Sequence, residues 1–161
     1  MADLNRKESS DERIKVLAAV AIVSRGKVLL IREQEEPYQG EWVVPQGYVK
    51  RDETVSEAAR REVREELGVE VDLEGLVGVY DATSMVGSER VHYVIVCYLG
   101  RIRTGEPRPT VEAIDSAWVD VRNRFQGVAA PVQRLLVDLS QSNRREHKYG
   151  RDRPRQYEVG R

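Results

Sequence analysis

The sequence has little cysteine, little histidine and no long apolar run. Its single cysteine, Cys97, cannot form an internal disulfide, and because it lies in the apolar run HYVIVCYLG we interpret it as a packing residue. Two histidines are too few for a histidine metal cluster. The polar residues 1–13 lack the pattern of a secretory signal, and the longest apolar run, residues 16–23, is too short to cross a bilayer. We therefore expect a cytoplasmic protein without a membrane partner.

The chain also lacks an excess of either charge. Its 26 lysines and arginines face 27 aspartates and glutamates among 161 residues, which gives a formal net charge of -1. Proteins dedicated to nucleic acids are usually clearly basic, so nucleic acid is not an expected partner. The residues from Asn143 onward carry a mild basic excess, which we interpret as that of a solvated tail.

The length suits one domain, which we place at residues 14–141, with a flexible N-terminus at 1–13 and a weakly ordered polar tail at 142–161. Runs of apolar and β-branched residues predict the strands. They lie at residues 16–23, 27–32, 42–45, 75–84, 89–100 and 116–121. One helix is expected between the third and fourth strands, and another at residues 128–139. Strands on both sides of one central helix indicate an α+β sandwich.

Local signals define the ends of the central helix. Thr54 followed by Glu57 is a capping box, so the helix should begin near Val55. Leu67 should end it, because Gly68 supplies the left-handed residue that commonly follows a helix. At about 100° of rotation per residue, one apolar stripe should face the core. It consists of Ala59, Val63 and Leu67.

Three carboxylates border this stripe. Glu62 and Glu66 lie one turn apart with Glu65 beside them, and like charges at that spacing repel each other. On charge alone, a solvated face that uses Arg61 and Arg64 as neighbours would explain them. The alternative is a site for a hard divalent cation, because carboxylate oxygens suit magnesium and manganese.

The spacing of the whole segment favours the cation site. Gly47 is followed after five residues by Glu53, and seven more residues lead to the run REVREELGV at 61–69. This pattern fixes nine positions within 23 residues and resembles the Nudix box, the signature of the Nudix hydrolase family. The resemblance extends from about residue 16 to residue 121 and does not cover the termini. It implies an α/β/α sandwich with a mixed sheet between helices.

The resemblance also implies a role for each matching residue. The implied ligands of Mg²⁺ or Mn²⁺ are Glu62, Glu65, Glu66 and the backbone carbonyl of Gly47. Glu53 and Arg61 resemble the family's structural ion pair, which braces the loop against the helix. Arg61 should therefore orient carboxylates more than it contacts substrate.

Members of this family hydrolyse a nucleoside diphosphate linked to another group. Water attacks a phosphorus atom of the diphosphate, cations neutralise its oxygens, and a glutamate activates the water. Glu62 or Glu66 could be this base, but the family also uses a glutamate from a later loop. Here Glu112 is the best-placed candidate and Asp115 is its rival.

Two residues depart from the common family pattern at the start of the box. Gln46 replaces a glycine, and Asp52 stands where glycine often precedes the glutamate. Aspartate tolerates left-handed backbone better than most residues, so the turn should survive.

Three side chains are candidates for substrate contact. Arg32 could meet a phosphate or be an ordinary surface arginine at the end of a strand. Trp42 and Tyr48 could either stack on a base or pack in the core.

The resemblance therefore implies a magnesium-dependent pyrophosphohydrolase of a nucleoside triphosphate, ADP-ribose or a dinucleoside polyphosphate. One alternative is an RNA 5′-end pyrophosphohydrolase, which would need a basic RNA-facing surface. A second is a non-catalytic nucleotide-binding module, which would tolerate loss of box carboxylates, yet none is missing. An isomerase on the same fold would need additional catalytic groups. The sequence does not determine the oligomeric state, although members of the family are often homodimers.

Overall fold

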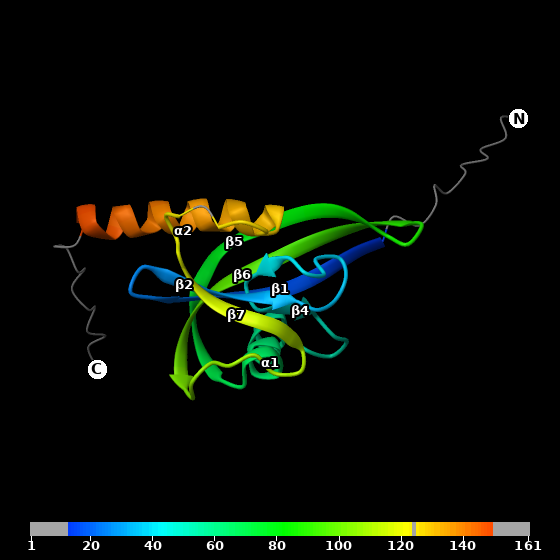
Figure 1. Cartoon of the computed structure of the whole chain (residues 1–161), viewed down its shortest axis with the longest axis horizontal. Coiled ribbons are helices and arrows are strands. Elements are labelled where there is room, and N and C mark those ends of the chain that lie inside the picture. Colours follow the sequence, from blue (N-terminus) through cyan, green and yellow to red (C-terminus); the bar gives the residue numbers. More distant parts are fainter. Residues whose placement is uncertain (1–12, 124, 150–161) are drawn as a thin grey trace, which may run out of the picture.

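The computed structural model describes residues 13–149 except residue 124 (Figure 1). Seven strands and two helices follow one another along the described chain. They are β1 (Arg13–Ser24), β2 (Lys27–Glu33), β3 (Trp42–Val43), β4 (Gln46–Tyr48), α1 (Val55–Leu67), β5 (Glu70–Val86), β6 (Glu89–Thr104), β7 (Ala113–Asp120) and α2 (Ala130–Tyr149). Of the ends expected to be flexible, 1–13 and 142–161, only residues 1–12 and 150–161 lie outside the described residues.

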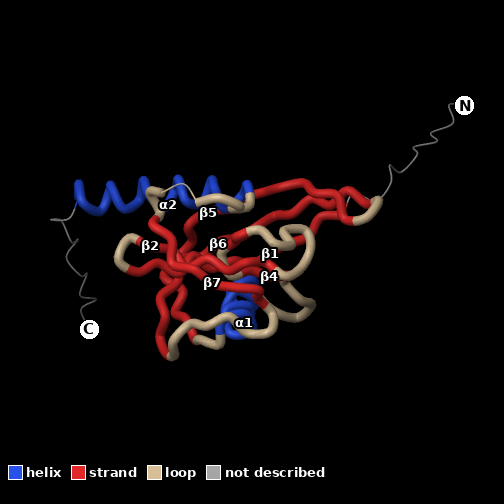
Figure 2. Tube along the Cα trace, viewed as in Figure 1, coloured by secondary structure: helices blue, strands red, loops and turns tan. Residues whose placement is uncertain are grey.

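The strands form one mixed sheet in the order β3-β2-β1-β6-β5. Strands β1 and β6 run parallel, and the other pairs are antiparallel. Strand β4 pairs with residues 17–19 of β1, and β7 pairs with β2. Figure 1 shows α2 on one side of the strands and α1 on the other, and Figure 2 shows the same layers as a tube. The expected sandwich with a mixed sheet between helices is therefore confirmed.

Helix α1 begins and ends where its local signals predict. The Thr54 side chain accepts from the Glu57 backbone, and the Glu57 carboxylate accepts from the Thr54 backbone. Gly68 adopts a left-handed conformation with φ of 69°. The predicted apolar stripe is buried, so α1 packs this stripe against the sheet.

Several elements are longer than the sequence pattern predicts, and β5 and α2 exceed it most. Strand β5 begins at Glu70 and its register against β6 shifts near Gly75 and Gly78, which interrupt the alternation of apolar residues. Helix α2 continues from Leu139 to Tyr149, within the segment expected to be a weakly ordered tail. Apolar periodicity stops near Leu139, but the following residues are mostly tolerant of helix and include no proline or glycine.

Candidate active site

The start of the box lies on β4, whose side chains alternate between the two faces of the sheet. Gly47 faces α1, and an ideal Cβ placed there would overlap the carboxyl group of Glu62. Only glycine therefore lets the Glu62 carboxylate approach the β4 backbone this closely. The turn that follows includes Asp52 with φ of 68°, so this residue does adopt the expected left-handed conformation.

Arg61 is the centre of an ion-pair network between this loop and α1. Its Nε and Nη2 donate to the two carboxylate oxygens of Glu53 at 3.0 and 2.7 Å. Its Nη1 donates to Glu62 at 2.5 Å and to Glu65 at 2.8 Å, and Nη2 also donates to the backbone carbonyl of Tyr48 at 2.9 Å. The hydrogen bonds from Arg61 lower the pKa of Glu53 to about 2. One guanidinium thus joins the loop, β4 and two box carboxylates.

Glu66 is the most buried carboxylate of the box, with only 4% of its surface exposed. Its Oε2 accepts a hydrogen bond from the backbone N–H of Gln46 at 3.2 Å. Burial raises the pKa of Glu66 well above its usual value, and the nearby carboxylates Glu33 and Glu62 raise it further. A strongly raised carboxylate pKa in a concave site is typical of a functional group.

The loop between β6 and β7 is attached to the end of α1. Thr110 donates from its backbone N–H to the carbonyl of Glu66 at 2.9 Å and from its hydroxyl to the carbonyl of Glu65 at 2.5 Å. These bonds place the next residues, Val111 and Glu112, at the wall of a cavity beside the box. The rival base Asp115 lies on β7 opposite Arg32 and does not line this cavity.

The cavity beside α1 has a volume of about 420 Å³ and is strongly acidic. Seven glutamates line it, namely Glu33, Glu35, Glu36, Glu62, Glu65, Glu66 and Glu112. The basic side chains of its wall are Lys50 and Arg61. Phosphate groups would be repelled from such a surface unless cations offset the carboxylates. Gly47 and Tyr48 also line it, so most of the residues singled out in the sequence meet here.

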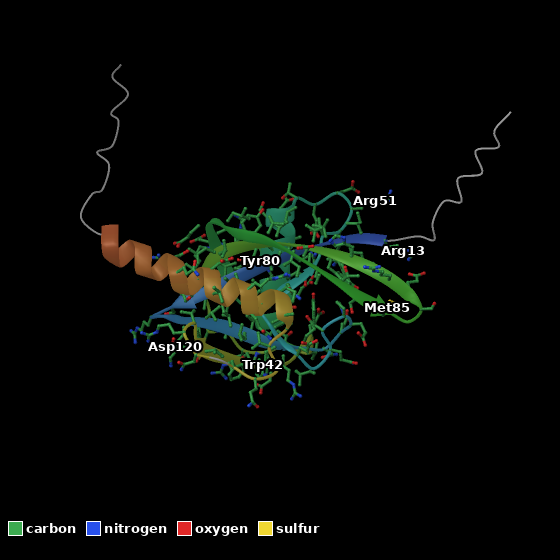
Figure 3. All side chains as sticks on the ribbon, turned by 90° about the horizontal axis from the view of Figure 1, so that it is seen from above. Arg13, Trp42, Arg51, Tyr80, Met85 and Asp120 are labelled. Carbon is green, nitrogen blue, oxygen red and sulfur yellow. The ribbon has the colours of Figure 1, made fainter. Side chains whose placement is uncertain are left out.

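Two candidates for substrate contact lie outside the cavity. The Arg32 side chain donates from Nε to the carbonyl of Gly40 at 3.0 Å. Trp42 packs edge-on against Phe125 with 5.4 Å between the ring centroids. Figure 3 shows Trp42 and Arg51, a residue of the loop before α1, at opposite edges of the molecule. We therefore assign neither Arg32 nor Trp42 a role in substrate binding.

Sequence reasoning missed a second wall of the cavity. This part of the cavity is lined by Glu33, Tyr38, Gln46 and Lys50. In the sequence, Gln46 stands out only as a departure from the family pattern. Residues 33–41 read as a simple loop in the sequence. The one available signal was the clustering of three glutamates next to an aromatic residue in EQEEPY.

The donor set fits a hard divalent cation, although the described residues contain no preassembled group of three metal-ligating side chains. In this arrangement Nη1 of Arg61 donates to both Glu62 and Glu65. The close approach of the Glu62 carboxyl group to Gly47, which any Cβ would block, brings a carboxylate next to the β4 backbone, as a cation held by both would require.

Gly47→Ala is expected to lower metal-dependent activity roughly a hundredfold with a small effect on stability. The added Cβ displaces the Glu62 carboxyl, which is the flexible end of a side chain, so the backbone can stay in place. Steady-state rates and thermal unfolding of the purified variant check this. An active Gly47→Ala protein would show that the close approach of Glu62 to β4 is not required.

Glu66→Gln is expected to stabilise the metal-free protein. The gain in its free energy of unfolding over the wild-type protein should grow as the pH rises. In the folded state the pKa of Glu66 lies well above 4.5, the ordinary value that applies to the unfolded state. Above pH 4.5 the folded state therefore binds more protons than the unfolded state. Stability contributed by this proton is therefore lost as the pH rises through the folded-state pKa. Urea unfolding of wild type and Glu66→Gln in chelator, from about pH 4.5 to about pH 8, should show a widening difference. A constant difference would contradict the raised pKa.

No helix among the described residues combines the length and apolar character needed to cross a membrane.

The mixed sheet between two helices and the acidic cavity beside α1 define an α+β domain with a carboxylate-rich site. A family model, the NUDIX domain, matches residues 14–136. The chain therefore belongs to the NUDIX family.

Individual relatives agree with this assignment. The crystal structure of a MutT NUDIX hydrolase from Burkholderia pseudomallei superposes with a TM-score of 0.71 at 30% identity, covering 79% of this chain and 98% of that one. The ADP-ribose pyrophosphatase of Methanocaldococcus jannaschii is 28% identical and shares 74% of this chain and 72% of its own length. The low-salt glycan biosynthesis protein Agl8 of Haloferax volcanii is 36% identical over 55% of this chain. That match spans 64% of Agl8, less than two thirds of its length.

Proposed function

We propose that this protein is a Mg²⁺- or Mn²⁺-dependent pyrophosphohydrolase that cleaves the diphosphate linkage of a nucleotide or nucleotide derivative. The observation that carries the proposal is the acidic cavity, where three box carboxylates from α1 meet Glu112 from a distant loop. Membership of the NUDIX family and the similarity to a MutT NUDIX hydrolase support the same reaction class. Retention of Glu62, Glu65 and Glu66 argues against a non-catalytic nucleotide-binding module.

The box residues would have separate roles in catalysis. Glu62, Glu65, Glu66 and the carbonyl of Gly47 would hold the cation. When bound, the cation would lower the pKa of water and neutralise charge on the phosphates. Arg61 would fix the positions of the carboxylates through the network it forms with Glu53.

A carboxylate of the cavity would take the proton of the attacking water. Glu62, Glu66 and Glu112 all line the cavity, so all three remain candidates for the general base. Glu112 comes from a loop outside the box and is anchored through Thr110, so it can approach the substrate from a different side from α1. Separate substitution of Glu112 by glutamine would identify it as the base if kcat falls while cation binding persists.

The relatives direct the choice of substrates to test. One of them is an ADP-ribose pyrophosphatase, so ADP-ribose comes first, followed by the nucleoside triphosphates and dinucleoside polyphosphates that the sequence resemblance implies. A small nucleotide suits a cavity of about 420 Å³. A cytoplasmic location stays a prediction from the sequence, and a homodimer stays what the family resemblance suggests.

A substrate panel with Mg²⁺ or Mn²⁺ tests the proposal. The panel contains ADP-ribose, NADH, dinucleoside polyphosphates, normal and oxidised nucleoside triphosphates, and RNA with a 5′-triphosphate. Cation-dependent release of phosphate, pyrophosphate or mononucleotide from one of the small molecules is expected. Activity on RNA alone would favour the RNA 5′-end alternative, and failure on every compound would refute the hydrolase function.

A further inference from the structure

Strand β4 divides the cavity into two chemically different halves. Gly47 faces α1 and the Glu62 carboxylate, so the neighbouring side chains Gln46 and Tyr48 face the other side of the sheet. On that side the cavity wall also includes Leu17, which pairs with Tyr48, and Tyr38 from the loop after β2. The carboxylates of α1 therefore lie on one side of β4, and a group of uncharged side chains lies on the other.

The uncharged half suits an organic group better than a phosphate. Burial raises the pKa of Tyr38 to about 12, so this phenol stays protonated at neutral pH. Lys15 caps the Tyr48 ring, with its Nζ 4.8 Å from the centroid, and Tyr93 packs against Tyr48 with 6.5 Å between the centroids. These contacts hold Tyr48 as a fixed wall, with part of its ring already covered.

Three buried side-chain oxygens among the described residues lack a hydrogen-bond partner, those of Tyr38, Gln46 and Tyr93, and the first two belong to residues that line the cavity. The Gln46 Oε1 and Tyr38 Oη atoms are buried, and neither has a partner among the described residues. The two residues are only 5% and 7% exposed, yet both line the cavity. Buried polar atoms are normally paired, and an unpaired one is costly. A ligand with matching polar groups would remove that cost, and a small rotation of the Gln46 amide would present its carbonyl to the ligand.

The chemistry of this half selects a particular kind of ligand. The unpaired Gln46 carbonyl is an acceptor, and the exposed carboxylates of Glu35 and Glu36 in the adjacent wall are acceptors as well. A group that offers N–H donors would complement all three. An amide side chain is also well suited to adenine, whose edge offers an amino donor beside a ring-nitrogen acceptor.

We propose that Gln46 and Tyr38 form a specificity subsite for a nucleobase with an exocyclic amino group. The inference rests on the proposed function and names the organic part of its substrate. Gln46 also joins the two halves of the site, because its backbone N–H donates to Glu66 while its side chain faces the subsite. The base would thus be held next to the carboxylates that would act on the diphosphate.

Gln46→Met and Tyr38→Phe test the subsite, because each removes the unpaired polar atom and nearly preserves the volume. Tyr80→Phe is the matched control, since it also removes a buried phenol hydroxyl, but one that donates to Asp138 at 2.6 Å outside the cavity. Substrates are built on whichever linkage the wild-type protein hydrolyses, with adenosine or with purine riboside, which lacks the amino group. The readouts are kcat/KM for each substrate and the thermal unfolding temperature.

The wild-type protein is expected to prefer adenosine by about tenfold, and both cavity variants should lose most of that preference. Their unfolding temperatures should be unchanged or higher, because the lost atom had no partner. Tyr80→Phe should keep the preference and unfold at a lower temperature. A preference that survives in both cavity variants overturns the proposal. So does a lower unfolding temperature of Tyr38→Phe with unchanged selectivity, which would show that a buried water satisfies the hydroxyl.

A binding measurement separates this inference from the proposed function. Adenosine and purine riboside carry no phosphate, so their binding to the metal-free protein can be followed by NMR titration without hydrolysis. Tighter binding of adenosine, lost in Gln46→Met, would support the subsite even if the wild-type protein hydrolysed nothing in the panel. Equal binding of the two nucleosides, or equal binding by wild type and Gln46→Met, would overturn it.

Discussion

Replacing Glu66 by glutamine is expected to abolish metal-dependent turnover and leave the fold intact. The glutamine carbonyl can still accept the hydrogen bond from the Gln46 backbone, so the local structure should persist. The substitution removes the negative charge that a hard cation requires. We expect kcat to fall by a factor on the order of 10³, comparable with the loss of a main electrostatic group in an active site. The unfolding temperature without metal should stay the same or rise, because a buried charge is removed.

The matched control is Glu57→Gln, the same chemical change on the same helix but outside the cavity. Glutamine also completes a capping box, so this variant should keep wild-type activity and nearly all of its stability. Rates with Mg²⁺ and Mn²⁺ and thermal unfolding with and without cation give the comparison. Full activity of Glu66→Gln would remove Glu66 from the metal site. An equal loss in both variants would point to damage to α1 instead.

The parts of the fold that depend on neighbouring residues could be predicted from the sequence. The capping box, the glycine after Leu67 and the apolar stripe of α1 are all encoded within a few positions of one another. The left-handed Asp52 was likewise foreseeable from its place in the turn. The end of α2 was not, because the residues after Leu139 have helix propensity without the apolar periodicity on which the prediction relied.

The cavity itself could be predicted only in part, because its walls come from distant segments. The box carboxylates are identified by spacing, but nothing local shows that Tyr38 and Glu33 reach the same cavity. Likewise, Thr110 fixes Glu112 beside α1 through bonds to backbone carbonyls, which leave no pattern in side-chain spacing. Trp42 lies close to the box in sequence but packs against Phe125, and Figure 3 shows it at the edge of the molecule opposite Arg51 of the box loop.

Arg61→Ala is expected to lower both stability and activity. The guanidinium donates to three carboxylates and one backbone carbonyl. Its removal would leave Glu53, Glu62 and Glu65 without the positive charge that they share. Partly buried charges without a partner destabilise a fold, so the unfolding temperature should drop by roughly 5 °C or more. Activity should fall as well, because Glu62 and Glu65 would lose the contact that fixes their positions. Arg61→Lys should restore little, because an ammonium group cannot reproduce the bidentate contact with Glu53.

Arg60→Ala is the control, since Arg60 is the neighbouring residue and its Nη1 donates a long 3.4 Å hydrogen bond to the carbonyl of Ser56. Arg60→Ala should change neither the unfolding temperature nor the activity strongly. Adding Mg²⁺ distinguishes two explanations for a loss of activity in Arg61→Ala, namely misplaced carboxylates and a lost contact with the substrate. If Arg61 acts by offsetting and placing carboxylates, Mg²⁺ should stabilise the variant more than it stabilises the wild-type protein, because a cation then offsets charges left unpaired. A variant that is as stable as wild type but inactive would instead make Arg61 a group that contacts the substrate.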